Sequence, residues 1–315
     1  MILLAIRSLF SESSTGSIFL ALLGVLSIAL GVVLAISSET GPSATAFWRF
    51  VFGGAGCAAL SCAVLGGGVW AELHKVLGRP EMWVAGISFA LSMAFWYSGM
   101  RISSVATTST FHNMSPLLLA VVAWFVFGMR PSRQVLAGLA VALIGAALLA
   151  FQSGGLEDQA LEGDLLALIS AGFLAVFYSC LTRLSRDCHP WIIMTVVSFI
   201  SAVILLAIAV ASEDVLVPQS RFGWSIVIAL GLVTQVLGQS LMGWASKRLG
   251  AFGICSITLT EPALSALMAA FLIAAPLHGP HLIGMALTAT GLFVMLEHRH
   301  RVRSEPAPRL CPNEV

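Results

Sequence analysis

Glu261 is the residue of this sequence whose chemistry most needs an explanation. It lies about midway along an apolar run and directly precedes Pro262. An ionisable side chain at membrane depth is costly, so such residues mark functional sites by default. The carboxyl group could bind a cation or relay a proton. The alternative is a protonated or hydrogen-bonded structural glutamate beside a kink.

Arg49 is the second buried-charge candidate, and it follows Trp48 near the beginning of another apolar run. Its guanidinium could anchor an anion or a carboxylate in a cavity, or it could pair with Glu261 across the molecule. The alternative is an arginine that snorkels to the membrane interface while its aliphatic stem stays in lipid. We count Trp48 with it as a candidate substrate contact.

A polar stripe lies in a third apolar segment, around His112 and Asn113. Thr108, His112 and Ser115 are spaced so that they share one face of a helix. We expect this face to point away from lipid and His112 to line a cavity. For Asn113, packing between helices with its polar groups bonded internally is an equal alternative.

Two prolines follow polar residues in equivalent places. Pro116 removes the helical hydrogen bond to the carbonyl of His112, and Pro262 does the same for Thr258. We therefore expect helix kinks at both prolines. Carbonyls freed at membrane depth are suited to a binding site near the bilayer midplane.

Two glutamines and three aromatic residues complete the candidates for substrate binding. Gln235 and Gln239 share a helix face and could hydrogen-bond either a solute or another helix. Trp96, Tyr97 and Tyr178 could stack on a planar solute, with an aromatic belt at the membrane interface as the alternative. The sequence contains neither a typical zinc-site spacing nor a nucleotide-binding phosphate loop, so we expect no metal and no cofactor.

The elements that must position these residues are membrane-spanning helices. Hydrophobic residues make up 58% of the 315 positions and charged residues only 10%, whereas soluble domains carry about 25% charged residues. Apolar runs of about 18 to 25 residues alternate with short charged clusters, and one such run crosses a bilayer as an α-helix. The expected spans lie near residues 18–37, 44–66, 82–99, 104–127, 134–151, 164–182, 190–211, 223–245, 250–274 and 280–297.

The distribution of basic residues orients these spans. Of the 16 Lys and Arg residues, all but Arg49, Arg101 and Arg221 fall in segments that an even number of spans places on the same side as both termini. The loops on the other side are mainly acidic. By the positive-inside rule, we expect both termini to be cytoplasmic and the protein to lie in the plasma membrane, which is the inner membrane of a bacterium.

An internal repeat divides the chain into two similar halves. The offset that aligns Pro116 with Pro262 also aligns Gly138 with Gly284. Because each half holds an odd number of spans, we expect the halves to be inserted in opposite orientations. Inverted repeats of this kind are typical of secondary transporters, in which they surround a central site.

The expected fold is therefore an all-α polytopic membrane protein of ten transmembrane helices in two inverted five-helix repeats. The repeats are expected at residues 18–151 and 164–297, with an external linker at 152–163 between them. A cytoplasmic segment at residues 1–17 precedes them, and a basic cytoplasmic tail at 298–315 follows.

Three segments resemble the drug/metabolite transporter superfamily, specifically its EamA-type group: ATAFWRF at 44–50, GMRISSVATTSTFHNMSPLLLAVVAWFVFG at 99–128, and SKRLGAFGICSITLTEPALSALMAAFLI at 246–273. The resemblance implies ten helices, cytoplasmic termini and a central cavity lined by both halves. It also implies a cargo such as an amino acid, a metabolite, a nucleobase or a drug, often exported. The chain departs from the family at two span ends, where Met129 and Ala275 replace its usual glutamates.

The expected function is that of a secondary transporter for a small organic solute, working by alternating access and in the export direction. The alternatives are a channel-like facilitator or a membrane sensor. An intramembrane enzyme is less supported, because we find no paired nucleophile and base at membrane depth. The expected partners are a small-molecule substrate, the lipid bilayer and, as a candidate coupling ion, the proton. Nucleic acid is not expected, and the sequence does not indicate an oligomeric state.

Overall fold

The computed structural model describes residues 14–103, 105–120, 132–151, 158–213 and 215–273, together with a few residues between 283 and 294. Every regular element in this part of the chain is helical. The elements are α2 (Ser14–Ile36), α3 (Pro42–Leu65), η1 (Gly66–Gly68), α4 (Val69–Leu77), α5 (Pro80–Ile102), α6 (Val105–His112), α8 (Arg133–Phe151), α9 (Asp158–Asp187), α10 (Pro190–Ser212), α11 (Arg221–Gly231), η2 (Leu232–Gln239), α12 (Ser240–Thr258) and α13 (Glu261–Ile273).

Five helical stretches of the described residues are long and apolar enough to cross a membrane. They are Thr15–Ile36, Pro42–Leu77, Leu161–Asp187, Pro190–Ser212 and Arg221–Thr258. The end of the expected span at 104–127 and most of the span at 280–297 lie outside the described residues. The count of ten spans therefore remains a prediction.

Prolines define where several helices begin. Pro42, Pro80 and Pro190 occupy the first turns of α3, α5 and α10. A proline is suited to this position because its missing N–H has no acceptor there and its φ angle is already helical. The helix starts consequently fall within a few residues of the expected span boundaries.

Two helical features differ from the sequence prediction. The eighth span contains a π-helix, η2, which carries Gln235 and Gln239. The expected loop after the second span contains a short amphipathic helix, α4. Helix α3 ends before it at the C-cap residue Gly66, which has a φ of 51°. Gly250 has a φ of 65° inside α12 and separates the expected eighth and ninth spans, a conformation that glycine adopts without strain.

Both candidate kinks are full interruptions of a helix. Residues 113–114 form a turn between α6 and the helical residues 115–120, and residues 259–260 form a turn between α12 and α13. Pro116 and Pro262 each occupy the second position of the helix that follows. The two interruptions are separated by the same offset as the two prolines.

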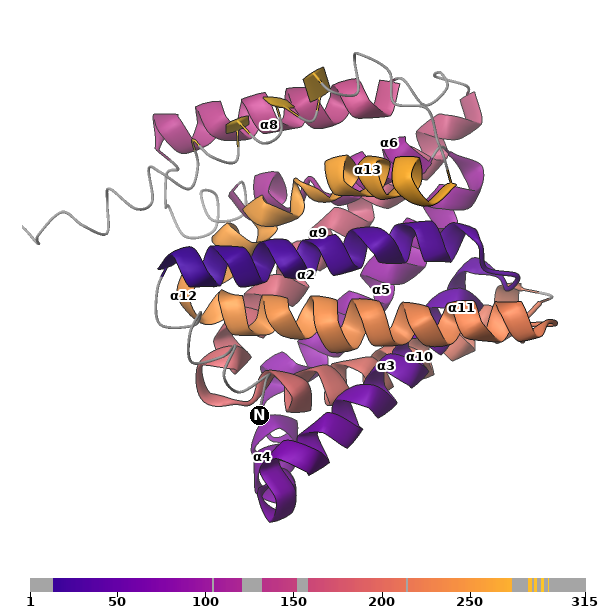
Figure 1. Ribbon diagram of the computed structural model, residues 1–315, viewed down its shortest axis with the longest axis vertical. Coiled ribbons are helices and arrows are strands. Elements are labelled where there is room, and N and C mark those ends of the chain that lie inside the picture. The colour runs from indigo at the N-terminus through magenta and orange to yellow at the C-terminus, as the bar shows by residue number, and fades with distance from the viewer. Residues whose placement is uncertain are drawn as a thin grey trace, which may run out of the picture.

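The helices before residue 151 and those after residue 158 interleave. In Figure 1, α2 runs beside η2 and α12, while α8 and α4 lie at opposite edges of the bundle. Helix α5 packs along α9, and α3 packs along α10. Phe89 of α5 stacks on Phe177 of α9 with ring centroids 4.0 Å apart. The main hydrophobic core therefore lies between the two parts of the chain.

Glycines bring α2 and α3 close to the π-helix. A Cβ atom on Gly53 would lie 2.5 Å from Cβ of Gln235, and one on Gly56 would lie 2.7 Å from Val236 Cγ2. Gly24 faces the carbonyl of Gly238 in the same way. These contacts hold the glutamines of η2 directly against α3, which carries Arg49.

Candidate functional site

The structure gathers most of the predicted site residues in one buried group, which we call the polar cluster. Its members come from α3, α5, α6, α9, η2 and α13, and each is at most 4% exposed. They are Arg49, Trp96, Tyr97, His112, Asn113, Tyr178, Gln235, Gln239 and Glu261. Tyr97 links several of them, because its hydroxyl contacts Arg49 and its ring packs edge-on against Trp96, which in turn stacks on His112.

Arg49 does not snorkel to the membrane interface. Its Nη1 donates to the hydroxyl of Tyr97 at 3.2 Å and to the sulfur of Met93 at 3.6 Å. Its Nη2 donates to Oε1 of Gln235 at 3.3 Å. Gln235 in turn donates from Nε2 to the hydroxyl of Ser198 at 3.4 Å. The guanidinium therefore joins α3 to α5 and η2 through neutral groups.

His112 lies between an aromatic ring and a serine. Its ring stacks on Trp96 with centroids 4.5 Å apart and an interplanar angle of 16°, and Nδ1 lies 2.7 Å from the hydroxyl of Ser170. That hydroxyl donates its hydrogen to the carbonyl of Ala167 at 2.6 Å. The hydrogen between His112 and Ser170 must then come from Nδ1, which assigns the histidine tautomer.

Glu261 is the first residue of α13 and lies beside the turn at residues 113–114 that follows α6. The Asn113 side chain is a neighbour of its carboxyl group and donates to the carbonyl of Ser109 at 2.8 Å. Oε1 of Glu261 has no hydrogen-bond partner among the described residues. Tyr178 completes this side of the cluster, with Gln239 as a neighbour of its hydroxyl.

Trp48 is the one predicted site residue that lies outside the polar cluster. Its Nε1 donates to the carbonyl of Leu216 at 2.9 Å. Its ring packs against Phe52 and Trp224, with centroid separations of 5.8 and 4.9 Å. Trp48 thus points in a different direction around the α3 axis from its neighbour Arg49.

Sequence reasoning missed the smaller partners of the cluster, namely Met93, Ser170 and Ser198. Serines in apolar helices usually bond to their own backbone, as Ser179 does with the carbonyl of Ala175. Nothing in the sequence separates Ser170 and Ser198 from such residues. Only the direction of each side chain around its helix axis distinguishes them.

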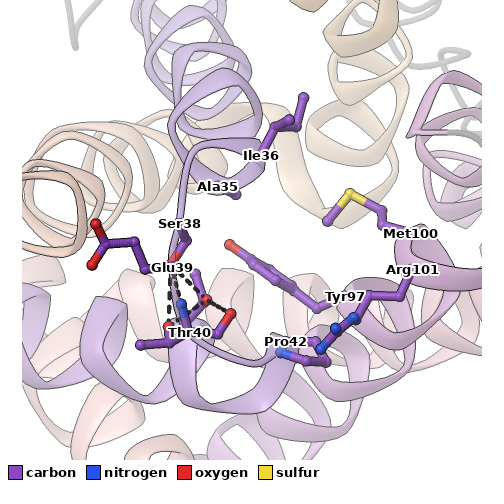
Figure 2. A pocket seen from close by; sticks show the side chains of 10 residues that line it. Ala35, Ile36, Ser38, Glu39, Thr40, Pro42, Tyr97, Met100 and Arg101 are labelled. Carbon is purple, nitrogen blue, oxygen red and sulfur yellow. Dashed lines mark hydrogen bonds between the residues drawn. The ribbon is translucent and has the colours of Figure 1, made fainter. Parts of the chain in front are cut away.

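A cavity of about 320 Å³ leads toward the cluster between α2, α3 and α5. We call it the α2–α3 cavity; Figure 2 shows Tyr97 projecting into it. Its other lining residues are Ala35, Ile36, Ser38, Glu39, Thr40, Pro42, Thr45, Met100 and Arg101. Because the Tyr97 hydroxyl also contacts Arg49, Tyr97 connects the cavity with Arg49. Among the described residues, no group of three His, Cys, Asp or Glu side chains could hold a metal ion.

One end of the bundle, which we call the Glu39 end, is joined by carboxylates and backbone amides. Oε1 of Glu213 accepts from the N–H of Ser43 at 2.6 Å, and Oε2 accepts from the N–H of Ala44 at 2.9 Å. These are N–H groups of the first turn of α3, which have no acceptor within the helix. The negative charge also lies favourably at the positive end of the helix dipole. Glu213 therefore caps α3 from a loop that follows α10.

Glu39 forms the reciprocal contact at the same end. Its Oε2 accepts from the N–H groups of Gln219 and Ser220, both at 3.0 Å, and the Ser220 hydroxyl donates to Oε1. The Ser220 hydroxyl and N–H, with a smaller contribution from Gln219, lower the pKa of Glu39 below its usual value of 4.5. The loop between α2 and α3 and the loop before α11 thus hold each other in place.

The other end, which we call the Asp187 end, is joined by charged side chains. Nη2 of Arg79 lies 2.7 Å from Oδ2 of Asp187, and Nζ of Lys75 donates to the carbonyl of Asp187. The bond to Asp187 raises the pKa of the Arg79 guanidinium. Three aromatic rings in tilted or edge-on contact lie near this end: His189, Trp191 and Trp244.

The arrangement of long apolar helices around a buried polar cluster defines the class of an integral membrane protein. A model of the EamA-like transporter family matches the chain over residues 3–151 and again over residues 161–297. The chain belongs to the EamA-like transporter family. We call residues 3–151 the first segment and residues 161–297 the second segment.

Relatives and a solved structure agree with the family. The chain is 28% identical over 164 residues to a pseudopaline exporter of Pseudomonas aeruginosa, across 51% of this chain and 55% of that protein. The chain thus spans about half the length of this relative. It is 24% identical to a protein of Synechocystis sp. named as an uncharacterized transporter, across 73% of this chain and 72% of that one. A crystal structure with 22% identity superposes with a TM-score of 0.70 over 93% of this chain and 99% of the other, which shows the fold alone.

Proposed function

We propose that this chain is a secondary transporter that exports a small organic solute across the cytoplasmic membrane by alternating access. The observation that carries the proposal is the polar cluster at the contact between the two segments. Arg49, Tyr97 and His112 come from the first segment, and Gln235 and Glu261 from the second. A solute held between two segments can be passed from one side to the other when they rearrange.

The proposed topology has ten spans in two inverted five-helix repeats, with both termini in the cytoplasm. The matching of one family model to both segments supports the repeat, as do the helix interruptions at residues 113–114 and 259–260. The basic residues support the orientation. In this orientation the Glu39 end and the α2–α3 cavity face outward. The name of the Pseudomonas aeruginosa relative supports export as the direction.

Glu261 is the proposed coupling residue. It is 3% exposed, and its Oε1 lacks a partner among the described residues. A carboxyl group that changes protonation in the same cluster as a cation alters the charge of the whole site. Proton binding and solute binding would then influence each other.

The aromatic and amide side chains are proposed to hold the body of the solute. Trp96, Tyr97 and Tyr178 offer ring faces and edges to a planar or apolar part. Gln239 offers a free amide oxygen, since its Oε1 has no partner among the described residues. Ser170 keeps His112 oriented against Trp96 and acts as a positioning residue.

Reconstitution into proteoliposomes tests this proposal. We expect saturable flux and counterflow of a labelled solute, screened among amino acids, nucleobases and organic acids, and stimulation of that flux by a pH gradient. Glu261→Gln is expected to abolish the stimulation and retain counterflow, because exchange needs no net proton movement. Glu162→Gln, which alters an exposed glutamate near the beginning of α9, is the matched control and should behave as wild type.

Each deviation from this pattern has a distinct meaning. Flux that rises linearly with solute concentration and shows no counterflow would contradict alternating access and support a channel-like facilitator. Unchanged stimulation by the pH gradient in Glu261→Gln would remove this residue from coupling. The absence of flux for every solute tested would contradict the transporter proposal itself.

A further inference from the structure

Arg49 is a buried cation without an ion-pair partner. It is 2% exposed, and among the described residues no carboxylate oxygen lies within 4.0 Å of its nitrogens, since the ion pairs there involve Lys75 and Arg79. Burial of a charge without a counter-charge is strongly unfavourable. The neutral oxygens of Tyr97 and Gln235 compensate for only part of this cost. Among the described residues, no carboxylate pairs directly with the Arg49 guanidinium, which leaves it open to an anion.

The guanidinium also has a free donor in a useful position. Its Nε–H has no hydrogen-bond partner among the described residues, and Nη2, on the same edge of the guanidinium, donates to Oε1 of Gln235 at 3.3 Å. Nε and the Nη nitrogen on the same edge of a guanidinium form a planar fork that matches the two oxygens of a carboxylate. The remaining Nη1 stays bonded to the Tyr97 hydroxyl, which would keep the fork in place.

Tyr97 connects this cation to the α2–α3 cavity. Its ring lines the cavity while its hydroxyl covers Arg49. The cavity has two charged lining residues, Glu39 and Arg101. The Glu39 carboxylate is taken up by the backbone of Gln219 and Ser220 and points away from Tyr97 in Figure 2. The charge left to interact with a solute in the cavity is that of Arg101, which favours an anion.

We propose that the transported solute carries a carboxylate, which displaces the Gln235 amide oxygen and binds Nε and Nη2 in the plane of the Arg49 guanidinium. This inference rests on the proposed transport function and adds the chemical class of the solute. Arg49 is the one arginine or lysine among the members of the polar cluster. A single cation matches the one negative charge of a carboxylate, whereas a phosphate monoester would leave a second charge uncompensated in the interior.

Benzoate and its near-isosteric amide, benzamide, test the carboxylate directly. The full chain is purified in detergent, and its thermal unfolding midpoint is measured against increasing concentrations of each compound. Benzoate is expected to raise the midpoint and benzamide to leave it unchanged. The apparent affinity for benzoate should exceed that for benzamide by about 10-fold or more, because hydrogen bonds to charged groups contribute about 1.5–3 kcal/mol.

Gln235→Glu is the most informative variant. It changes one amide nitrogen into an oxygen and puts a carboxylate beside Nη2 of Arg49, where Oε1 of Gln235 now lies at 3.3 Å. An internal counter-ion should raise the unfolding midpoint without ligand and weaken benzoate binding about 10-fold or more. Gln134→Glu, the same substitution at an exposed position of α8, is the matched control and should bind benzoate as wild type does.

Two further variants separate loss of the site from loss of folding. Arg49→Gln should lose the benzoate response, but it also removes a buried charge and its bonds. Gln235→Met keeps a side chain of similar length and removes the amide oxygen that competes for Nη2 of Arg49, so its benzoate affinity should rise. Tighter binding cannot result from misfolding, which makes this variant a test that an unstable protein cannot imitate.

The outcomes distinguish this inference from the transport proposal. Equal effects of benzoate and benzamide, no effect of either, or an unchanged benzoate response in both Gln235→Glu and Arg49→Gln would overturn the carboxylate site. Solute flux in proteoliposomes without preference for acids over their amides would overturn this inference and retain the transporter. A benzoate response that depends on Arg49, together with no flux for any solute, would retain the site and contradict transport.

Discussion

The two ends of the bundle join the same two parts of the chain by different chemistry. At the Glu39 end, carboxylates accept hydrogen bonds from backbone N–H groups, as Glu213 does at the start of α3. At the Asp187 end, an exposed ion pair between Arg79 and Asp187 joins α5 to α9, with side chains 33% and 52% exposed. The loops involved are those before α3 and before α10, which occupy equivalent places in the proposed repeats.

Because of this difference, the two ends should respond differently to salt and to pH. A carboxylate on a partly buried helix N-terminus is little screened by salt and depends on its own ionisation. An exposed ion pair is screened by salt and contributes little to stability. The Glu39 end, where the α2–α3 cavity opens, is therefore expected to be held more firmly than the Asp187 end. A transporter that rearranges between two states would then open at the Asp187 end at lower cost.

Removal of the α3 cap should have the largest effect on this comparison. Glu213→Ala leaves two N–H groups of the first turn of α3 without acceptors, so we expect a loss of about 2 kcal/mol in the free energy of unfolding. Chemical denaturation in detergent measures it. Glu162→Ala, at an exposed site of α9, is the control. A loss no larger than that of the control would show that Glu213 does not stabilise this end.

Gly41 offers a second test of the contact between Glu213 and the start of α3. A Cβ atom on Gly41 would overlap Oε2 of Glu213, although its φ of −59° is open to any residue. Gly41→Ala should therefore cost about 1 kcal/mol in wild type and close to nothing in the Glu213→Ala background, because the two residues share one contact. A double-mutant cycle measures the coupling. Additive effects would mean that the alanine acts elsewhere.

The ion pair at the other end should contribute less. We expect Asp187→Asn to reduce the free energy of unfolding by at most about 1 kcal/mol at low salt, and the reduction should shrink as salt is raised toward 1 M. Denaturation series at several salt concentrations measure this, with Glu72→Gln as a matched change at a second exposed ion pair. The comparison between the ends fails if the effect of Asp187→Asn equals that of Glu213→Ala and does not depend on salt.

The smallest expected effect is the loss of the stabilising contribution of Glu39 at acidic pH. The pKa of Glu39 is lowered in the folded protein relative to its usual value of 4.5, so its stabilising contribution is present above pH 4.5 and is lost as the pH falls through the lowered pKa. The difference in unfolding midpoint between wild type and Glu39→Gln should therefore be constant at neutral pH and shrink in acid. Thermal unfolding between pH 3 and pH 7 in detergent follows it. A difference that grows as the pH falls would contradict this assignment.

Several site residues could be predicted because a charge inside an apolar run is itself a strong signal. Glu261 and His112 stand in runs that otherwise lack ionisable groups, and both are buried in the polar cluster. Adjacent positions show the limit of this reasoning. Trp48 and Arg49 were predicted as one site, yet the helix points them in different directions, and Trp48 bonds to the carbonyl of Leu216.

The sequence alone identified the apolar runs that are long enough to cross a membrane and the side chains that are too polar for lipid. Both follow from local properties: the length of an apolar run, and the cost of an ionisable group at membrane depth. Tertiary structure alone decided which of these side chains meet. Arg49 reaches Gln235 because glycines of α3 let it approach the π-helix, and Ser170 contacts His112 because α6 packs on α9. The rotation of each helix about its axis is set by its neighbours, and no local pattern specifies it.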